Sequence, residues 1–291
     1  MRVALLGFGL IGGSIAHALR RAGPDWSIAA WSPSGTGPRA ALELGVVDAA
    51  PTRAAEAIRD ASVVLLAAPP LACLELLGSL AGPLREALSP DSVITDVAST
   101  KRTIVGTAVQ LGLRFVGGHP MAGREISGFG GASADLFDGR PWVIVPGRSD
   151  DGAAQDLVAA LALACRARPI AMAADDHDEA VAGISHLPLV VAAALVESVV
   201  GSDATGTDPG WGAAAVLSAS GWEGMTRLVR GDATMGAGIL ATNADAVAAR
   251  LRVLRDNLDR WLADLERTGG PDADELRERL AASKQRLETE R

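Results

Sequence analysis

The sequence is poor in the residues that build disulfide frameworks, metal centres and nucleic-acid surfaces. Its 291 residues include 2 cysteines, 4 histidines and no tyrosine. Cys73 and Cys165 lie far apart in apolar surroundings, which is typical of reduced, buried thiols, and no cluster of metal-ligating residues is present. The formal net charge is −8 and basic residues form no long runs, so the electrostatic field opposes nucleic acid and anionic membranes. An anionic substrate must therefore be bound by a few local arginines.

Long hydrophobic runs are also missing. The longest, near Pro188 to Val200, contains Glu197 and is too short to span a bilayer, and the N-terminal apolar run is more typical of a strand than of a signal peptide. With 48% hydrophobic and 21% charged residues, the chain can bury a substantial core, and its length favours two domains. We expect a soluble, cytoplasmic protein.

The N-terminus has the pattern of a dinucleotide-binding turn. An apolar run, Arg2 to Leu6, leads directly into Gly7-Phe8-Gly9-Leu10-Ile11-Gly12, and a helical pattern follows from Ser14 to Arg21. The first glycine permits a tight turn, the second lets a pyrophosphate approach the backbone, and the third allows close packing of helix on strand. N–H groups at the helix start then bind the phosphates. We predict that residues 7–12 bind a dinucleotide.

Further apolar runs are bounded by glycine, proline or charged residues and alternate with helical stretches. They cover residues 27–31, 62–68, 92–97, 114–117 and 142–145. This alternation predicts a parallel sheet. From Asp175 onward the pattern changes to long helices rich in alanine and leucine. The predicted fold is α/β, with an N-terminal Rossmann-type doubly wound parallel sheet over residues 1–172 and an all-helical C-terminal dimerisation domain over residues 173–291.

The choice between NAD and NADP stays open. Dinucleotide folds usually place an acidic residue after the second strand to bind the ribose 2′-hydroxyl, but here the chain has Trp31-Ser32-Pro33-Ser34. Ser32, Ser34, Thr36 and Arg39 can accommodate a 2′-phosphate. Equally, these can be ordinary loop residues of a protein that uses NAD. Ala68 and Pro69, after the third apolar run, are expected to line the same cofactor site.

One histidine stands out among His17, His119, His177 and His186. His119 lies in Gly117-Gly118-His119-Pro120-Met121-Ala122-Gly123, which we interpret as a rigid turn at the carboxyl end of a strand, where open α/β sheets bind their ligands. Imidazole accepts protons near neutrality, so His119 is a candidate base. The alternative is a buried histidine paired with the backbone. Ser99, near the end of the fourth strand, can orient a substrate hydroxyl or cap the next helix. Lys101 can be structural.

Two patterns mark the helical half. Ser185-His186-Leu187-Pro188 is predicted to open a helix, with proline in its first turn, and His186 either faces the cleft or is a capping or buried residue. Between Asn243 and Arg267, apolar residues alternate steps of four and three, forming a heptad seam of Val247, Leu251, Leu254, Leu258, Trp261 and Leu265. A core stripe within one subunit is the alternative, but we favour a homodimer through this helix.

Taken in order, five features resemble the prephenate and arogenate dehydrogenase family. They are the turn at Gly7, the segment Asp96 to Lys101, the Gly117 to Gly123 motif, Ser185-His186-Leu187-Pro188, and Thr226-Arg227-Leu228. The resemblance implies a Rossmann domain plus a dimeric helical domain, and NAD(P)-dependent oxidative decarboxylation of prephenate.

The resemblance also assigns roles to single residues. His119 matches the catalytic histidine that hydrogen-bonds the ring hydroxyl, and Ser99 matches the serine beside that hydroxyl. Arg227 matches the arginine that binds a substrate carboxylate, with a fork geometry that suits it. Glu125 falls where an acidic residue often lies near the mouth of the site, and His186 is expected to contact substrate.

Three departures from the family pattern lie in the helical half, at Leu189, Gly224 and Gly236, where members often have a histidine or glutamine, an acidic residue and a tryptophan. They leave prephenate, arogenate and a 4-amino analogue of prephenate open as substrates.

Two other classes compete with this interpretation. β-Hydroxyacid dehydrogenases need a catalytic lysine on a helix of the second domain, whereas the only lysines here are Lys101 and Lys284, the latter in the charged tail. A non-catalytic nicotinamide-nucleotide sensor would have no chemical need for His119, Ser99 and Arg227 together.

Overall fold

The computed structural model describes residues 1–124, 126–147, 151–202 and 206–289. The chain divides into two compact units, Met1–Ala244 and Asp245–Arg291.

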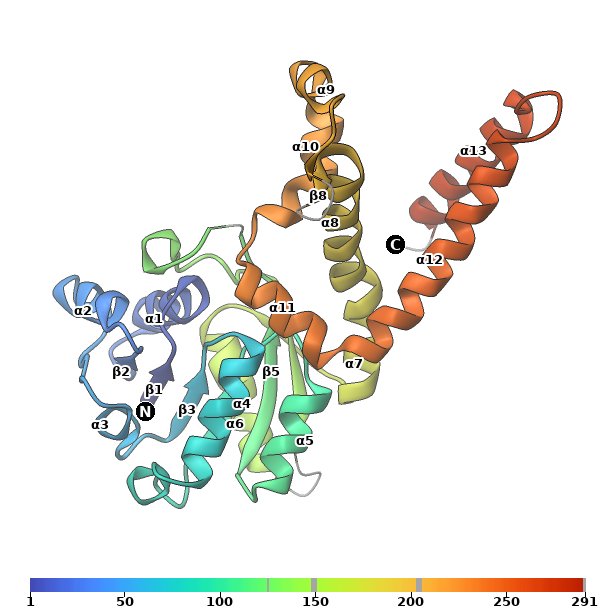
Figure 1. Ribbon diagram of the computed structural model, residues 1–291. Helices are drawn as coiled ribbons and strands as arrows, with labels where there is room; N and C mark the ends of the chain where they lie inside the picture. The colour runs from blue at the N-terminus through green and yellow to red at the C-terminus, as the bar shows by residue number, and fades with distance from the viewer. Residues whose placement is uncertain (125, 148–150, 203–205, 290–291) are drawn as a thin grey trace. The chain divides into compact units, whose positions relative to one another are not determined.

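A seven-stranded sheet is the centre of the first unit (Figure 1). Its order is β2-β1-β3-β4-β5-β6-β7. The strands are β1 (Arg2–Leu6), β2 (Ser27–Trp31), β3 (Val63–Leu66), β4 (Val93–Asp96), β5 (Phe115–Pro120), β6 (Pro141–Pro146) and β7 (Arg168–Ala171). Strands β1 to β5 pair in parallel. The predicted α/β fold with a Rossmann-type sheet is confirmed. β6 is antiparallel to β5, and β7 pairs in parallel with β6, a reversal that apolar runs alone do not show.

Helices cover both faces of this sheet. They are α1 (Leu10–Ala22), α2 (Thr36–Glu43), α3 (Ala54–Ile58), α4 (Pro70–Ala81), α5 (Arg102–Gln110) and α6 (Gly152–Ala164). Alternate residues of β1 face opposite sides, Val3 and Leu5 packing with α1, α2 and α6, and Ala4 and Leu6 packing with α3, α4 and α5. Short 3₁₀ turns occur at η1 (Arg85–Ala87) and η2 (Phe129–Gly131).

The two cysteines lie within these apolar layers. Cys73 and Cys165 are both free and buried, and burial raises the pKa of each thiol to about 12. The predicted pair of reduced, buried thiols is confirmed.

One long helix follows the sheet. Helix α7 (Ala174–Val181), a π-helical turn η3 (Ala182–His186) and α8 (Leu187–Val200) form a continuous stretch. As predicted, a helix opens within Ser185-His186-Leu187-Pro188 with Pro188 in its first turn, but it continues directly from α7 through η3. Pro188 has no N–H to donate, and the wider π turn, in which the Leu187 N–H donates to the Ala182 carbonyl, carries the helix past it.

This stretch is also longer than the sequence indicated. At 27 residues, with a mean hydropathy of 1.8 in its most apolar window, Ala174–Val200 could cross a membrane by length and composition alone. The apolar run near Pro188 to Val200 is the second half of this longer helix, which begins at Ala174. Only 22% of the window is buried within the chain.

Small elements complete the first unit. They are the antiparallel pair β8 (Gly201–Ser202) and β9 (Gly206–Thr207), α9 (Trp211–Leu217), α10 (Ser220–Thr226), the 3₁₀ turn η4 (Arg227–Arg230) and α11 (Ala233–Thr242). Helix α11 packs against α4, and η4 packs against α8.

The second unit consists mainly of α12 (Ala244–Leu265) and α13 (Ala273–Thr289). Arg279 of α13 lies 3.9 Å from the centre of the Trp261 ring and forms an ion pair with Asp264 of α12. Along the predicted seam, Leu251, Leu258 and Leu265 are 40%, 56% and 54% exposed. Val247 of the same seam is 5% exposed, and the homodimer through this helix stays a prediction.

Candidate active site

The carboxyl ends of the parallel strands bring most predicted site residues to one edge of the sheet. Strands β1 to β5 run in the same direction, so their carboxyl ends meet at one edge of the sheet. Five predicted features follow or end strands at that edge: the turn at Gly7, the loop after Trp31, the pair Ala68 and Pro69, Ser99, and His119. This is the edge at which open α/β sheets bind ligands.

The glycine turn has the shape that a dinucleotide requires. Gly7 has a φ of +93°, and a Cβ there would lie 2.3 Å from the Ala67 carbonyl oxygen. A Cβ on Gly12 would lie 2.7 Å from the Gly7 carbonyl oxygen, whereas one on Gly9 would meet nothing within 4 Å. Helix α1 begins directly afterwards with no side-chain cap and no acidic residue in its first turn. No side-chain cap or acidic side chain therefore competes with a diphosphate for the N-terminal N–H groups of α1.

The loop after β2 is held by its own serines. The Ser32 hydroxyl accepts from the Gly35 N–H at 3.2 Å, and the Ser34 hydroxyl accepts from the Thr36 N–H at 3.3 Å. The Arg39 guanidinium donates to the Ser34 carbonyl. Each hydroxyl keeps its O–H to donate, so the loop can still accommodate a phosphate.

His119 lies within strand β5 rather than in a turn. Residues Gly117 to Pro120 are paired with β6, and the interpretation of this segment as a tight turn is wrong because its glycines allow close strand packing: a Cβ on Gly118 would lie 2.5 Å from the Asp96 carbonyl oxygen. The His119 side chain is nearly buried, with 9% exposed.

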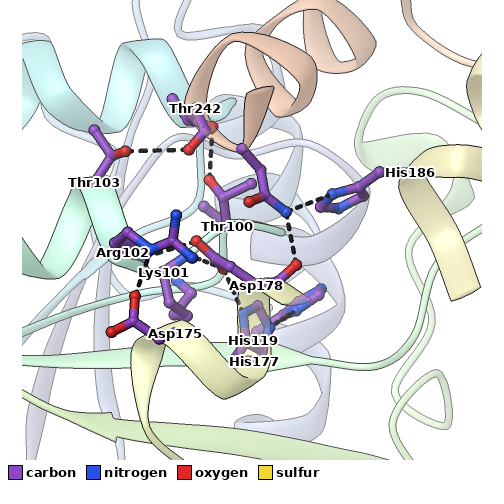
Figure 2. Close-up of polar contacts among 12 residues, drawn as sticks. Thr100, Lys101, Arg102, Thr103, His119, Asp175, His177, Asp178, His186 and Thr242 are labelled. Carbon is purple, nitrogen blue, oxygen red and sulfur yellow. Dashed lines mark hydrogen bonds and ion pairs between the residues drawn. The ribbon is translucent and has the colours of Figure 1, made fainter. Parts of the chain in front are cut away.

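The His119 ring forms one end of a chain of hydrogen bonds (Figure 2). Its Nδ1 lies 2.8 Å from Nε2 of His177, and Nδ1 of His177 lies 2.7 Å from Oδ1 of Asp178. The alternative of a histidine paired with the backbone is therefore wrong. Nε2 of His119 has no hydrogen-bond partner within residues 1–124, 126–147, 151–202 and 206–289.

The Asp178 carboxylate also caps helix α5. It accepts from the backbone N–H of Lys101 at 2.7 Å and of Arg102 at 2.9 Å, where the helix dipole favours a negative charge. Ser99 is thus not the cap of this helix. Asp178, which lies on α7, therefore contacts both the start of α5 and the ring of His177.

Two further contacts join α11 to the same cluster. The Asn243 side-chain amide donates to the Asp178 carbonyl at 2.8 Å and lies 3.2 Å from Nδ1 of His186. The Thr100 and Thr242 hydroxyls are 2.7 Å apart. Segments distant in sequence therefore form one polar cluster at the sheet edge, as Figure 2 shows.

Lys101 has a structural position. Its ammonium forms a fully buried ion pair with Asp96, which also accepts from the Gly118 N–H at 3.0 Å. The pair ties the end of β4 to β5 beside His119.

Burial keeps the two candidate histidines neutral. It lowers the pKa of His119 well below 6.5, and the positive charge of Lys101 acts in the same direction. Burial also lowers the pKa of His186 to about 4. For Asp178, burial opposes ionisation, but hydrogen bonds from His177 and from the Arg102 and Lys101 N–H groups outweigh it and bring the pKa below 3.8.

The structure does not bring every predicted residue together. Ser99 is half-buried and lies beside His186. Arg227 is exposed on η4 and lines an open hollow of about 470 Å³ that His119 does not line. Glu125 lies outside the described residues. No group of three or more potential metal ligands occurs in the part of the chain that the structure describes.

His177 and Asp178 are the residues that the sequence analysis missed. They lie in Asp175-Asp176-His177-Asp178-Glu179, which has the composition of a solvated helix start. The available signal was helical spacing, because positions 177 and 178 share a face with Val181 and Ala182.

Comparison with known families supports the resemblance. Residues 15–171 match the family described as "Prephenate dehydrogenase, nucleotide-binding domain", and residues 173–282 match "Prephenate dehydrogenase, dimerization domain". The first match begins after the glycine turn.

Individual relatives agree with these matches. The chain is 31% identical over 268 residues to the prephenate dehydrogenase of Bacillus subtilis, covering 91% of this chain and 68% of that protein. Prephenate dehydrogenase from Aquifex aeolicus, solved with hydroxyphenyl propionate and NAD+, is 27% identical with a TM-score of 0.84, covering 99% of this chain and 98% of that one. Synechocystis arogenate dehydrogenase is 30% identical with a TM-score of 0.77, covering 99% and 100%. The protein therefore belongs to the prephenate dehydrogenase family of NAD(P)-dependent dehydrogenases.

Proposed function

We propose that this protein catalyses the NAD(P)-dependent oxidative decarboxylation of prephenate to 4-hydroxyphenylpyruvate, a step of tyrosine biosynthesis. The observation that carries the proposal is the placement of His119. It lies at the ligand-binding edge of the sheet with Nδ1 held by His177 and Nε2 without a partner in the described chain.

The cofactor site is proposed from the residues that fit it. Gly7, Phe8, Gly9, Leu10, Ile11 and Gly12 would hold the diphosphate and adjoining ribose, Ala68 and Pro69 would line the site, and Ser32, Ser34 and Arg39 would lie toward the adenosine ribose. A bound nicotinamide supplies the acceptor for the hydride. Both NAD and NADP remain compatible with a loop that offers two hydroxyl donors and one guanidinium.

The protein's part in the reaction is mainly the handling of one proton. His119 Nε2 accepts the proton of the ring hydroxyl as hydride leaves the same carbon, which becomes a carbonyl carbon. Ser99 orients the hydroxyl. The ring carboxylate then leaves as carbon dioxide, its bonding electrons remain in the ring, and the resulting phenolate takes a proton back. A neutral His119, favoured by burial, is the form that can begin this sequence.

Substrate binding is assigned to Arg227, His186 and Glu125. The guanidinium fork of Arg227 would bind a carboxylate. The preference between the keto side chain of prephenate and the amino side chain of arogenate stays open. Two of the three departures from the family pattern lie side by side, since a Cβ on Gly236 would lie 3.4 Å from Cδ2 of Leu189. Arogenate is the second candidate substrate, favoured by the likeness to the Synechocystis enzyme, and the 4-amino analogue is the third.

The helical half is proposed to form a homodimer. The exposed leucines of the α12 seam and the helix Ala174–Val200, of whose most apolar window only 22% is buried within the chain, lie within the residues matched by the dimerization-domain family. We assign the apolar surface to a second copy of the chain rather than to a membrane, and we propose a cytoplasmic location. The domain boundary is proposed between residues 172 and 173.

The test is a rate comparison. Purified protein is mixed with prephenate, arogenate or the 4-amino analogue, each with NAD and with NADP, and the absorbance of the reduced nicotinamide is followed. We expect turnover with prephenate to be fastest. The absence of turnover with all three would instead favour a non-catalytic nucleotide sensor.

A further inference from the structure

We infer that His177 and Asp178 are positioning residues that fix the tautomer of His119, so that its Nδ1 carries the hydrogen and its Nε2 presents a lone pair. The catalytic significance of this tautomer rests on the proposed function, whereas the tautomer itself can be measured whatever reaction the protein catalyses.

The argument begins at Asp178. Its carboxylate accepts two backbone N–H groups at the start of α5 and has a pKa below 3.8, so it is ionised and can only accept hydrogen bonds. Nδ1 of His177, 2.7 Å from this carboxylate, must therefore carry a hydrogen.

The same logic passes to the next ring. A neutral imidazole has one N–H, so when Nδ1 of His177 is the donor, its Nε2 is an acceptor. Nδ1 of His119 lies 2.8 Å from that acceptor and must donate to it. Because burial and neighbouring positive charge keep His119 neutral, its second nitrogen, Nε2, is left with a lone pair.

The arrangement also suits the state after proton transfer. When Nε2 of His119 takes a proton, Nδ1 still donates to His177, so no hydrogen bond has to break or rotate. A site that needs no reorganisation during the reaction lowers the barrier. The opposite tautomer would leave Nε2 of His119 as a donor, unable to accept the hydroxyl proton.

A direct measurement separates this idea from the reaction. With only four histidines in the chain, protein labelled with ¹⁵N-histidine gives few ring signals, which replacement of single histidines assigns. We expect two-bond ¹H–¹⁵N spectra at pH 7.5 to show His119 and His177 as Nδ1–H tautomers. A His119 signal from the Nε2–H tautomer in the unaltered protein would overturn the inference.

A pair of substitutions at His177 supplies the kinetic test. The amide introduced by H177Q can still offer an oxygen to Nδ1 of His119, whereas the aliphatic side chain introduced by H177L cannot. We expect H177L to lower kcat about 10- to 100-fold, less than the roughly 10²- to 10⁴-fold contribution of a positioned base itself, with little change in KM or cofactor affinity. H177Q should recover most of the lost rate.

The control is the neighbouring surface substitution Asp176→Leu, because Asp176 is exposed on the same helix. It should change neither the His119 ring signals nor kcat. Equal rates for H177L and the unaltered protein would refute the positioning role, and if H177L fails to fold, the spectra of the unaltered protein and H177Q still decide. If no cyclohexadienyl substrate turns over, the proposed function fails while the tautomer remains measurable.

Discussion

The sheet region and the helical region bury very different kinds of side chain. Residues 1–172 contain both apolar layers of the core. In the described part of residues 173–289, the buried hydrophobic side chains are only Val181, Ala182, Ala192 and Val247. Since folding depends mostly on removing apolar area from water, the helical region needs a partner surface more than the sheet region does.

The polar side chains reverse this pattern. The helical region buries His177, Asp178, His186, Thr226, Thr242 and Asn243. His177, Asp178, His186, Thr242 and Asn243 take part in the cluster at the sheet edge. This difference fits the proposed division of roles, in which the sheet region would supply the fold and the base while the helical region would supply orientation of that base and the dimer contacts.

The largest expected effect comes from removing the base in the sheet region. His119→Asn should fold and bind cofactor but lose turnover by about 10²-fold or more, because general-base catalysis contributes on that scale. Stopped-flow or steady-state rates, together with cofactor titration by fluorescence, measure this. A variant with a near-normal rate would remove His119 from the mechanism.

The next effect tests whether the helical region binds substrate. Arg227→Ala should raise KM roughly 10- to 100-fold, the value of a charge-assisted hydrogen bond, with cofactor affinity unchanged. Arg230→Ala, on the same 3₁₀ turn, is the matched control and should change KM less. An unchanged KM in the Arg227 variant would contradict its assigned role.

A third substitution tests the unburied surface itself. Leu258 and Val253 of α12 are both 56% exposed, but only Leu258 lies on the heptad seam. Leu258→Lys should therefore convert a dimer to a monomer at micromolar concentration, and Val253→Lys should not. Light scattering after gel filtration gives the mass. Equal behaviour of the two variants would show that the seam is not the dimer contact.

The smallest effect concerns stability against pH. The pKa of His119 is well below 6.5 and that of His186 is about 4 in the folded chain, so the unfolded chain binds more protons as the pH falls below 6.5. The free energy of unfolding should hold above pH 6.5 and decrease between about 6.5 and 4. Denaturant titrations at several pH values measure it, and His186→Asn should flatten the slope. A slope of the same size in that variant would exclude His186 as a source.

Regular elements in the sheet region were predictable from sequence because their signals are local. The strands at residues 2–6 and 27–31 were predicted with their observed bounds, and the glycine spacing identified the turn at Gly7. Strand β7, Arg168–Ala171, was missed because it is short and has exposed ends.

The polar cluster was only partly predictable because its partners are distant in sequence. His119 was singled out by the residues around it, but His177 is 58 positions away, and only the fold brings the two rings within 2.8 Å. The acidic neighbours of His177 concealed its burial. The direction of β6 and the continuation of the helix through Pro188 likewise depend on tertiary packing.

The double duty of Asp178 limits how this protein can change. The Asp178 carboxylate caps the start of α5 and, through His177, orients the ring of His119. A substitution at this position therefore alters folding and chemistry at the same time. Random mutagenesis should therefore find few tolerated replacements at this position. Engineering of altered specificity is better directed at Leu189 and Gly236, where neither burden applies.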